Sequence, residues 1–265
     1  MIINLYDCIE KKRLGIFIMS SHQDLFNTNT SLLKEYYHNV IINNGFNADV
    51  YSFVGDETCE STYENGDTIH CKCSDRYIGD KIECVFNYVK TNKRYDYLIF
   101  TNASTFVNLK MIYNNLDSLN PFNFYYMISI PYNLVNGKEG FYANGNFKLF
   151  SFRILEKICS YYSHKKVILS QSFNMIEEKD DENSWLGMPE DIIIDFCLKE
   201  NNIPIIQVGN TIMLFDYHTN FLKSNSGSMK FKDVPIIQFK AFLHPHDRLL
   251  VEPNIIKQIT TEIGI

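Results

Sequence analysis

The sequence lacks the features that mark membrane-spanning, secreted or nucleic-acid-binding proteins. No run approaches the roughly 20 apolar residues that a membrane-spanning helix needs, and Asp7 and Glu10 stand where a signal peptide carries bases. Basic residues gather only in short groups, at 11–13 and 165–166, and the net charge is −6. Because nucleic-acid binding draws on a basic surface, nucleic acid is disfavoured as a partner. These absences predict a soluble, cytoplasmic protein without a membrane span.

Cysteine, glycine and proline are also used sparingly. Seven cysteines, an odd number, are scattered at positions 8, 59, 71, 73, 84, 159 and 197, so no disulfide framework is predicted. Cys71 and Cys73, near Cys59 and His70, lack the C-x-x-C spacing of zinc sites, and ordinary thiols are the better interpretation. With 12 Gly, 7 Pro and 45% hydrophobic residues among 265, the chain can bury a core unaided. No linker or repeat is visible, so we expect one domain over 1–265.

Apolar runs and helical patterns alternate in the first hundred residues. Strands are predicted at 13–19, 49–54 and 95–100, with helices at 28–44 and 79–91 between them and a polar, irregular stretch at 57–74. Gly45 stands where a helix terminator belongs. This βαβαβ order predicts an α/β protein with a mixed, mostly parallel sheet flanked by helices. Ligands of such sheets bind beyond the carboxyl ends of the strands.

The second half is less regular. Strands are predicted at 125–130, 147–150, 203–208 and 211–215, with a helix over 152–162 and a polar segment at 223–232. A further helix is predicted to open at Pro189 and run to about Asn201, because proline followed by acids in the first turn is a helix start signal.

The common enzyme fingerprints are missing. The sequence contains no G-x-G-x-x-G, G-x-x-x-x-G-K-[ST], G-x-S-x-G or H-E-x-x-H motif. Dinucleotide-binding, P-loop and α/β-hydrolase functions are therefore disfavoured.

Three segments occur in an order that suggests another class. They are Asp96–Asn108 (DYLIFTNASTFVN), Gly140–Arg153 (GFYANGNFKLFSFR) and Gly187–Asp195 (GMPEDIIID). Together they resemble GT-A glycosyltransferases of the β-1,3-galactosyltransferase and Fringe type, closest to a viral or bacterial branch. The resemblance implies a GT-A-like fold with a nucleotide-binding half at 1–108 and an acceptor and catalytic half at 109–265. It implies hexosyl transfer, with inversion, from a nucleotide sugar, a UDP-sugar being the first choice, to a saccharide acceptor.

The resembled family holds Mn²⁺ or Mg²⁺ with a D-x-D pair at the end of the third strand. This sequence has Asn102, Ala103 and Ser104 there, and neither an amide nor a hydroxyl supplies the same negative charge. The D-x-D is missing, so we expect metal-independent or weakly metal-dependent donor binding. The alternative is that Asn102 and Ser104 form a plain turn.

The resemblance also implies catalytic residues. Glu190 and Asp191 match the family's Glu-Asp at a helix start, and Asp191 is the expected general base that deprotonates the acceptor hydroxyl. The alternative is that the two acids only complement the helix dipole.

Basic residues near the end of the chain offer a substitute for the metal charge. His244 and His246 flank a proline in a segment predicted to be extended, so both rings would point to one side. Together with Lys240 and Arg248 they could offset the charge of a diphosphate, although an exposed polar loop is the alternative.

Further donor and acceptor residues follow from the resemblance. Ser20 and Ser21, which end the first strand, are expected to contact the nucleotide. Asp75 and Lys81 match donor-binding positions, with ordinary surface charges as the alternative.

On the acceptor side, Asn144 and Gly145 match a turn of the family. Trp185 could be a platform for an acceptor sugar or a core anchor.

Two other functions stay open. A catalytically inactive GT-A-like module that binds sugar or nucleotide, or acts as a scaffold, would explain the missing D-x-D. A nucleotidyltransferase would share the βαβ start. The composition, rich in Ile, Asn, Lys and Tyr, suggests a virus or a bacterium that builds glycans in the cytosol, which for a virus is the host cytoplasm.

Overall fold

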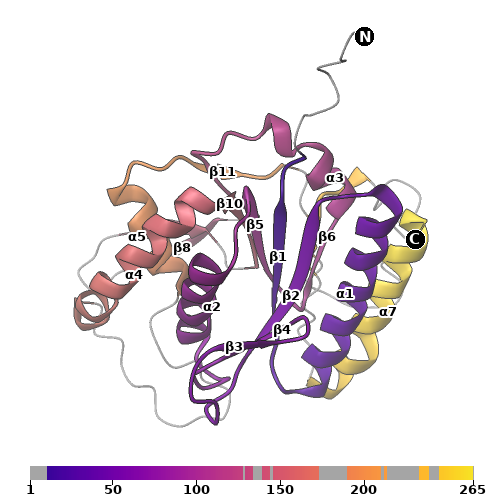
Figure 1. Cartoon of the computed structure of the whole chain (residues 1–265), viewed down its shortest axis with the longest axis horizontal. Helices are drawn as coiled ribbons and strands as arrows, with labels where there is room; N and C mark the ends of the chain where they lie inside the picture. Colours follow the sequence, from indigo (N-terminus) through magenta and orange to yellow (C-terminus); the bar gives the residue numbers. More distant parts are fainter. Residues whose placement is uncertain are drawn as a thin grey trace, which may run out of the picture.

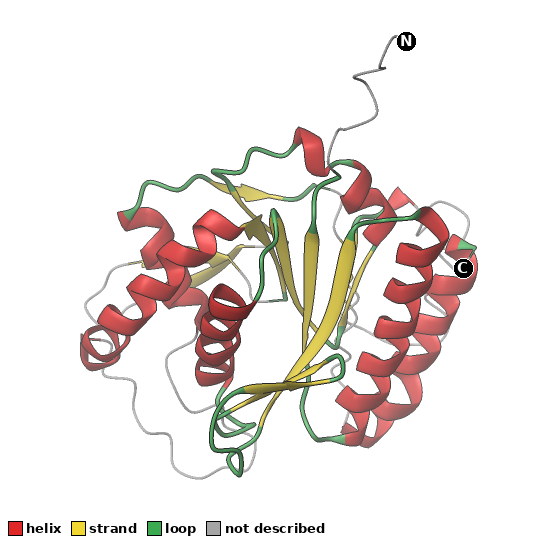
Figure 2. Cartoon of the chain, in the orientation of Figure 1, coloured by secondary structure: helices red, strands yellow, loops and turns green. Residues whose placement is uncertain are grey.

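The computed structural model describes residues 11–127, 129–133, 139–143, 146–172, 190–209, 212–213, 233–238 and 245–264. In this part of the chain, helices cover both faces of an eight-stranded sheet (Figures 1 and 2). The strands across the sheet are β11 (Ile205–Gln207), β7 (Phe124–Tyr126), β10 (Phe147–Ser151), β5 (Tyr97–Asn102), β1 (Leu14–Met19), β2 (Ala48–Gly55), β4 (Thr68–Cys71) and β3 (Tyr63–Asn65). Only β10 and β3 run antiparallel to their neighbours. The predicted α/β class with a mixed, mostly parallel sheet is confirmed.

The helices form two layers. On one face lie α1 (Asp24–Asn44), α3 (Leu109–Asn114) and α7 (Pro245–Ile263), with α1 and α7 side by side at the right of Figure 1. On the other face lie α2 (Ile78–Asn92), α4 (Phe152–Ser172) and α5 (Glu190–Glu200).

Each helix layer packs against one face of the sheet and forms a separate hydrophobic core with it. Ile16 and Ile18 of β1 face α1 and α7, while Phe17 faces the other core. There Phe17 begins a row of stacked rings on four neighbouring strands, with centroids 4.9, 5.7 and 5.2 Å apart through Phe100, Phe150 and Phe124. Strands buried on both faces need apolar residues at every position, which explains the unbroken runs in the sequence.

Two small sheets complete the described part. β6 (Thr105–Val107) pairs with β13 (Ile236–Gln238), which pairs with β12 (Ile212–Met213). β8 (Ser129–Asn133) and β9 (Glu139–Ala143) form an antiparallel pair. The single strand predicted at 125–130 is therefore two strands, β7 and β8.

Helix α1 ends as predicted but begins earlier. Gly45 adopts φ +61°, and its N–H donates to the carbonyl of Ile42. Glycine takes this left-handed conformation without the steric penalty of a Cβ. The helix begins at Asp24 rather than at Thr28, and four residues separate it from the end of β1.

The irregular stretch predicted at 57–74 is wrong in part, because it contains the hairpin of β3 and β4. Gly66 and Asp67 make the turn, with Gly66 at φ +61°, and β4 pairs in parallel with β2. Glycine at the first position of a two-residue turn is a hairpin signal. Only Ile69 and Cys71 of β4 are fully buried, so the strand has too few apolar residues to stand out in the sequence.

The extended segment predicted around His246 is also wrong, because α7 begins at Pro245 and includes His246. Proline is favoured at the first position of a helix, where its missing N–H costs nothing. His244 lies outside the described residues.

No helix in the described ranges combines the length and the hydropathy needed to cross a membrane.

Candidate active site

The crossover of the chain defines one place in the sheet as the expected ligand site. From β1 the chain moves through α1 to β2 and then β4 on one side, and it returns to β5 on the other side of β1. Ligands of open α/β sheets bind at such a switch point, outside the carboxyl ends of the strands. The carboxyl ends of β1 and β5 are joined by a hydrogen bond from Ala103 N to the Met19 carbonyl (3.1 Å). The predicted residues Ser20, Asn102 and Ser104 all lie at this point.

Asp75 and Lys81 hold the ends of β1 and β2 together. Lys81 is 2% exposed, and its Nζ lies 3.0 Å from Asp75 Oδ1 and donates to the Ser20 carbonyl at 3.1 Å. The Asp75 carboxylate also accepts from the N–H groups of His22 and Gly55, both at 3.0 Å. A Cβ on Gly55 would come within 2.5 Å of the Asp75 backbone, so this close approach requires glycine. The pair therefore fixes the loops that border the switch point.

Asn102 organises the turn after β5. Its Oδ1 accepts from Ser104 N at 3.0 Å and from Thr105 Oγ1 at 2.9 Å. Its Nδ2 donates to Oδ1 of Asn146, the residue before β10. Both ends of the Asn102 amide are thus used within the protein, and the side chain lies on the α2 and α5 side of the sheet, because it follows Phe100 by two residues.

Ser20 and Ser104 belong to a buried polar network on the opposite side, against α1 and α7. Thr30 Oγ1 donates to Ser20 Oγ (2.9 Å). Ser104 Oγ lies 3.2 Å from a carboxylate oxygen of Glu252, to which it donates. Ser20 and Ser104 are each 5% exposed, and Ser21 is 9% exposed. These hydroxyl groups are therefore mainly internal to the protein.

The network extends to a guanidinium group. Arg248 donates from Nε to Glu252 at 2.7 Å and from Nη2 to Ser104 Oγ at 3.1 Å. Glu252 is 0% exposed and also accepts from Asn29 Nδ2 at 2.7 Å. Three donors, from α1, the turn after β5 and α7, thus surround one buried carboxylate, as a buried charge requires.

Asp191 is part of a second buried ion pair. It lies in the first turn of α5, 2.7 Å from Nζ of Lys148 on β10, with side-chain exposures of 12% and 1%. Lys148 is paired with Phe100 in the sheet register and follows Asn146 by two residues, so it projects from the same face as Asn102. Asp191 thus pairs with a buried lysine in addition to its place in the first turn of the helix.

Five predicted residues lie outside the described part of the chain, namely Asn144, Gly145, Trp185, Lys240 and His244. For Glu190 and His246 the structure gives only their place in the first turns of α5 and α7. The roles assigned to these seven residues stay predictions.

Sequence reasoning missed Lys148, Asn146 and Glu252. Asn146 and Lys148 lie within the segment 140–153 that carries the resemblance, but no rule of sequence pattern pairs Lys148 with Asp191. Arg248 and Glu252 have the i, i+4 spacing of a helical ion pair, a signal that requires the helix to be predicted first.

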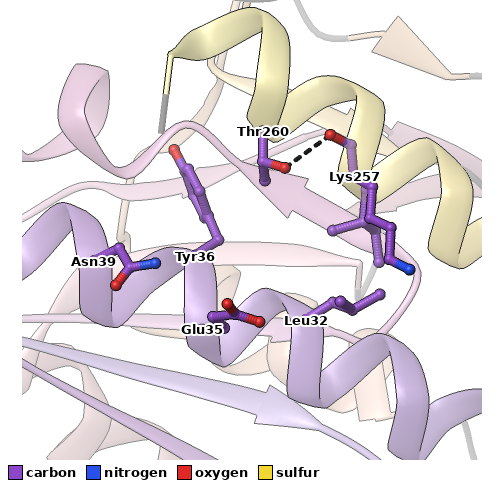
Figure 3. Close-up of a pocket in the computed structure, with 7 residues that line it drawn as sticks. Leu32, Glu35, Tyr36, Asn39, Lys257 and Thr260 are labelled. Carbon is purple, nitrogen blue, oxygen red and sulfur yellow. Dashed lines mark hydrogen bonds between the residues drawn. The ribbon is translucent and has the colours of Figure 1, made fainter.

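A cavity lies between α1 and α7, further along both helices than the Glu252 network. It measures about 220 Å³, and Thr260 Oγ1 donates to the Lys257 carbonyl at its rim (Figure 3). Its lining residues are Leu32, Glu35, Tyr36, Asn39, Ile256, Lys257 and Thr260. None of the predicted site residues is among them.

The thiol groups of the cysteines differ in pKa. A hydrogen bond from Cys73 lowers the pKa of Cys84 to about 7, whereas burial raises that of Cys159 to about 11 and that of Cys197 to about 12. Because the thiolate is the reactive form, we expect iodoacetamide at pH 7 to alkylate Cys84 first. The rate should fall as the pH drops through 7, as read by peptide mass spectrometry.

The matched variant for this labelling experiment is Cys73→Ala, made in a Cys8→Ser background. It removes the donor and should slow alkylation of Cys84. Equal labelling of Cys84 and Cys197 would contradict the assignment.

Comparisons with known proteins identify a likeness of structure but no family. No family model and no curated protein matches the chain. Among solved structures it is similar to one described as a glycosyltransferase involved in the glycosylation of the major capsid of PBCV-1. The TM-score is 0.46 and the identity 12%, over 92% of this chain and 99% of that one. The finer resemblance to the Fringe type stays a prediction.

Proposed function

We propose that the chain is a glycosyltransferase that moves a sugar from a nucleotide-sugar donor to a hydroxyl group of a saccharide acceptor, with inversion. The observation that carries the proposal is the buried Lys148–Asp191 pair, 2.7 Å apart, on the sheet face that carries Asn102 at the switch point. A carboxylate at the ligand-binding edge of an α/β sheet can serve as a general base.

In the proposed reaction one carbon–oxygen bond is made, one is broken and one proton is transferred. Asp191 accepts the proton of the acceptor hydroxyl while that oxygen bonds to the anomeric carbon of the donor. The bond from the anomeric carbon to the diphosphate breaks, and its electron pair leaves with the diphosphate. The catalytic contribution of Lys148 is to position Asp191, because its own ammonium group is 1% exposed and contacts the carboxylate.

The donor is assigned to the loops that follow β1, β2 and β5. The Asp75–Lys81 contact supports this assignment by fixing the loop after β1 and the end of β2 before the donor binds, which reduces the ordering cost of binding. Ser21 lies in the loop after β1, and Asn102 is the last residue of β5. The acceptor is assigned to the second half of the chain, where Asn144, Gly145 and Trp185 are proposed contacts.

The test is a screen of the purified protein against UDP-, GDP- and dTDP-sugars with mono- and disaccharide acceptors. Release of the nucleoside diphosphate is measured, and transfer is verified by mass spectrometry of the acceptor. We expect one nucleotide to be preferred and its release to depend on the acceptor. If none of the three nucleoside diphosphates binds in calorimetry and no sugar is transferred, the proposed function is wrong.

A further inference from the structure

The side chains at the end of β5 do not fit the divalent metal that the sequence resemblance implies. Mn²⁺ and Mg²⁺ prefer carboxylate oxygens, but the two positions hold Asn102 and Ser104. The Asn102 amide is hydrogen-bonded at both ends, and Ser104 Oγ contacts Glu252 and Arg248. Within the described ranges, no three His, Cys, Asp or Glu side chains are grouped so that they could hold a metal ion.

The positively charged side chain of Arg248 lies beside Ser104. Arg248 reaches Ser104 Oγ at 3.1 Å from the first turn of α7, and buried Glu252 one turn later fixes its Nε at 2.7 Å. The guanidinium also lies 5.7 Å from the ring centre of Phe26 in the first turn of α1. Three contacts from three elements thus hold the group in place at the switch point.

We propose that Arg248 binds the diphosphate of the donor in place of a metal ion, so that donor binding does not require a divalent cation. This inference rests on the proposed function. A guanidinium has five N–H groups in a fixed plane that suits bidentate contacts to phosphate. In the described part of the chain two of the five are engaged, by Glu252 and Ser104, and the side chain is 13% exposed.

The surrounding helices favour the same ligand. α1 has 21 residues and α7 has 19, and both begin beside the Glu252 network. The positive ends of their dipoles therefore add to the attraction of Arg248 for an anion. Because Glu252 and Ser104 fix the guanidinium before binding, little reorganisation is required when the diphosphate arrives.

The test uses inorganic pyrophosphate as the probe, titrated calorimetrically into the full chain in EDTA and again in Mn²⁺. We expect the same affinity in both buffers. Arg248→Gln should lower it about 10- to 100-fold, as loss of charge-assisted hydrogen bonds does. Arg248→Lys should recover only part of it, because a lysine lacks the planar fork. Lys257→Gln, an exposed change on the same helix, should leave it unchanged.

A second variant distinguishes a loss of pyrophosphate binding from a folding defect. Arg248→Gln leaves Glu252 buried without its cation, whereas Arg248→Gln combined with Glu252→Gln removes both charges and should restore the melting temperature. Pyrophosphate affinity should stay low in this double variant. Binding that requires Mn²⁺, or that survives in both variants, would overturn the inference.

The outcomes separate this inference from the proposed function. Sugar transfer by the wild type that stops in EDTA would overturn the role of Arg248 and leave the glycosyltransferase assignment standing. Metal-independent pyrophosphate binding through Arg248, without transfer from any nucleotide sugar, would support the anion site and count against the transferase.

Discussion

Asp191→Asn should lower the turnover number of sugar transfer by about 10²- to 10⁴-fold, the range typical of a lost general base. The amide keeps the shape of the carboxyl group, and its oxygen can still accept from Lys148. It cannot take the proton of the acceptor hydroxyl. Binding of the nucleoside diphosphate, measured by calorimetry, should stay within a factor of about 3, since the donor is assigned to other loops.

Asp117→Asn is the matched control for this prediction. Asp117 is exposed and lies near Leu119, whose carbonyl accepts from Tyr97 at the amino end of β5, the opposite edge of the sheet. This variant should transfer sugar at the wild-type rate. If Asp191→Asn does so too, another residue is the base. If it loses nucleotide binding as well as turnover, Asp191 contributes to the donor site.

Lys148→Met should destabilise the protein by about 3–5 kcal/mol, measured by urea unfolding. Methionine fills much of the volume of the lysine stem but leaves Asp191, 12% exposed, without its cation. Removing one partner of a buried ion pair lowers the stability of the fold, because the other charge stays buried without compensation. Turnover should fall as well, because the carboxylate loses the contact that positions it.

Two further variants show whether the loss of stability arises from breaking the Lys148–Asp191 ion pair. Lys148→Met combined with Asp191→Leu removes both charges and should recover most of the lost stability. Lys110→Met, on the exposed surface of α3, should change the stability by no more than about 0.5 kcal/mol. A loss of less than 1 kcal/mol in Lys148→Met would mean that water already screens the pair.

The sequence was sufficient to predict the strand ends that meet at the switch point. The runs Leu14–Met19 and Tyr97–Phe100 contain no charged or strongly polar residue, and strands buried on both faces require this. Their carboxyl ends must then lie at one edge of the sheet, where the structure places them. The β3–β4 hairpin was missed because β4 lies near the edge of the sheet and buries only Ile69 and Cys71.

The partners of the site residues could not be predicted in the same way. Lys148 stands between apolar residues of β10, and its pairing with Asp191 depends on how α5 packs against the sheet. Pro253 lies inside α7 and argues against a helix there, because proline cannot donate to the preceding turn. Burial of Ile255, Ile256 and Ile259 against α1 and the sheet outweighs that penalty. Such tertiary stabilisation has no local signal.

The side-by-side packing of α1 and α7 also governs when the protein can finish folding during its synthesis. The hydrogen bond between Asn29 and Glu252 joins residues that are 223 positions apart. At about 5–20 residues per second, a ribosome needs roughly 10 to 45 s to deliver the second after the first. Throughout that interval α7 is not yet packed against the apolar side of α1 and the adjoining face of the sheet. A nascent chain of this protein therefore offers a chaperone a long-lived apolar surface that the finished molecule does not have.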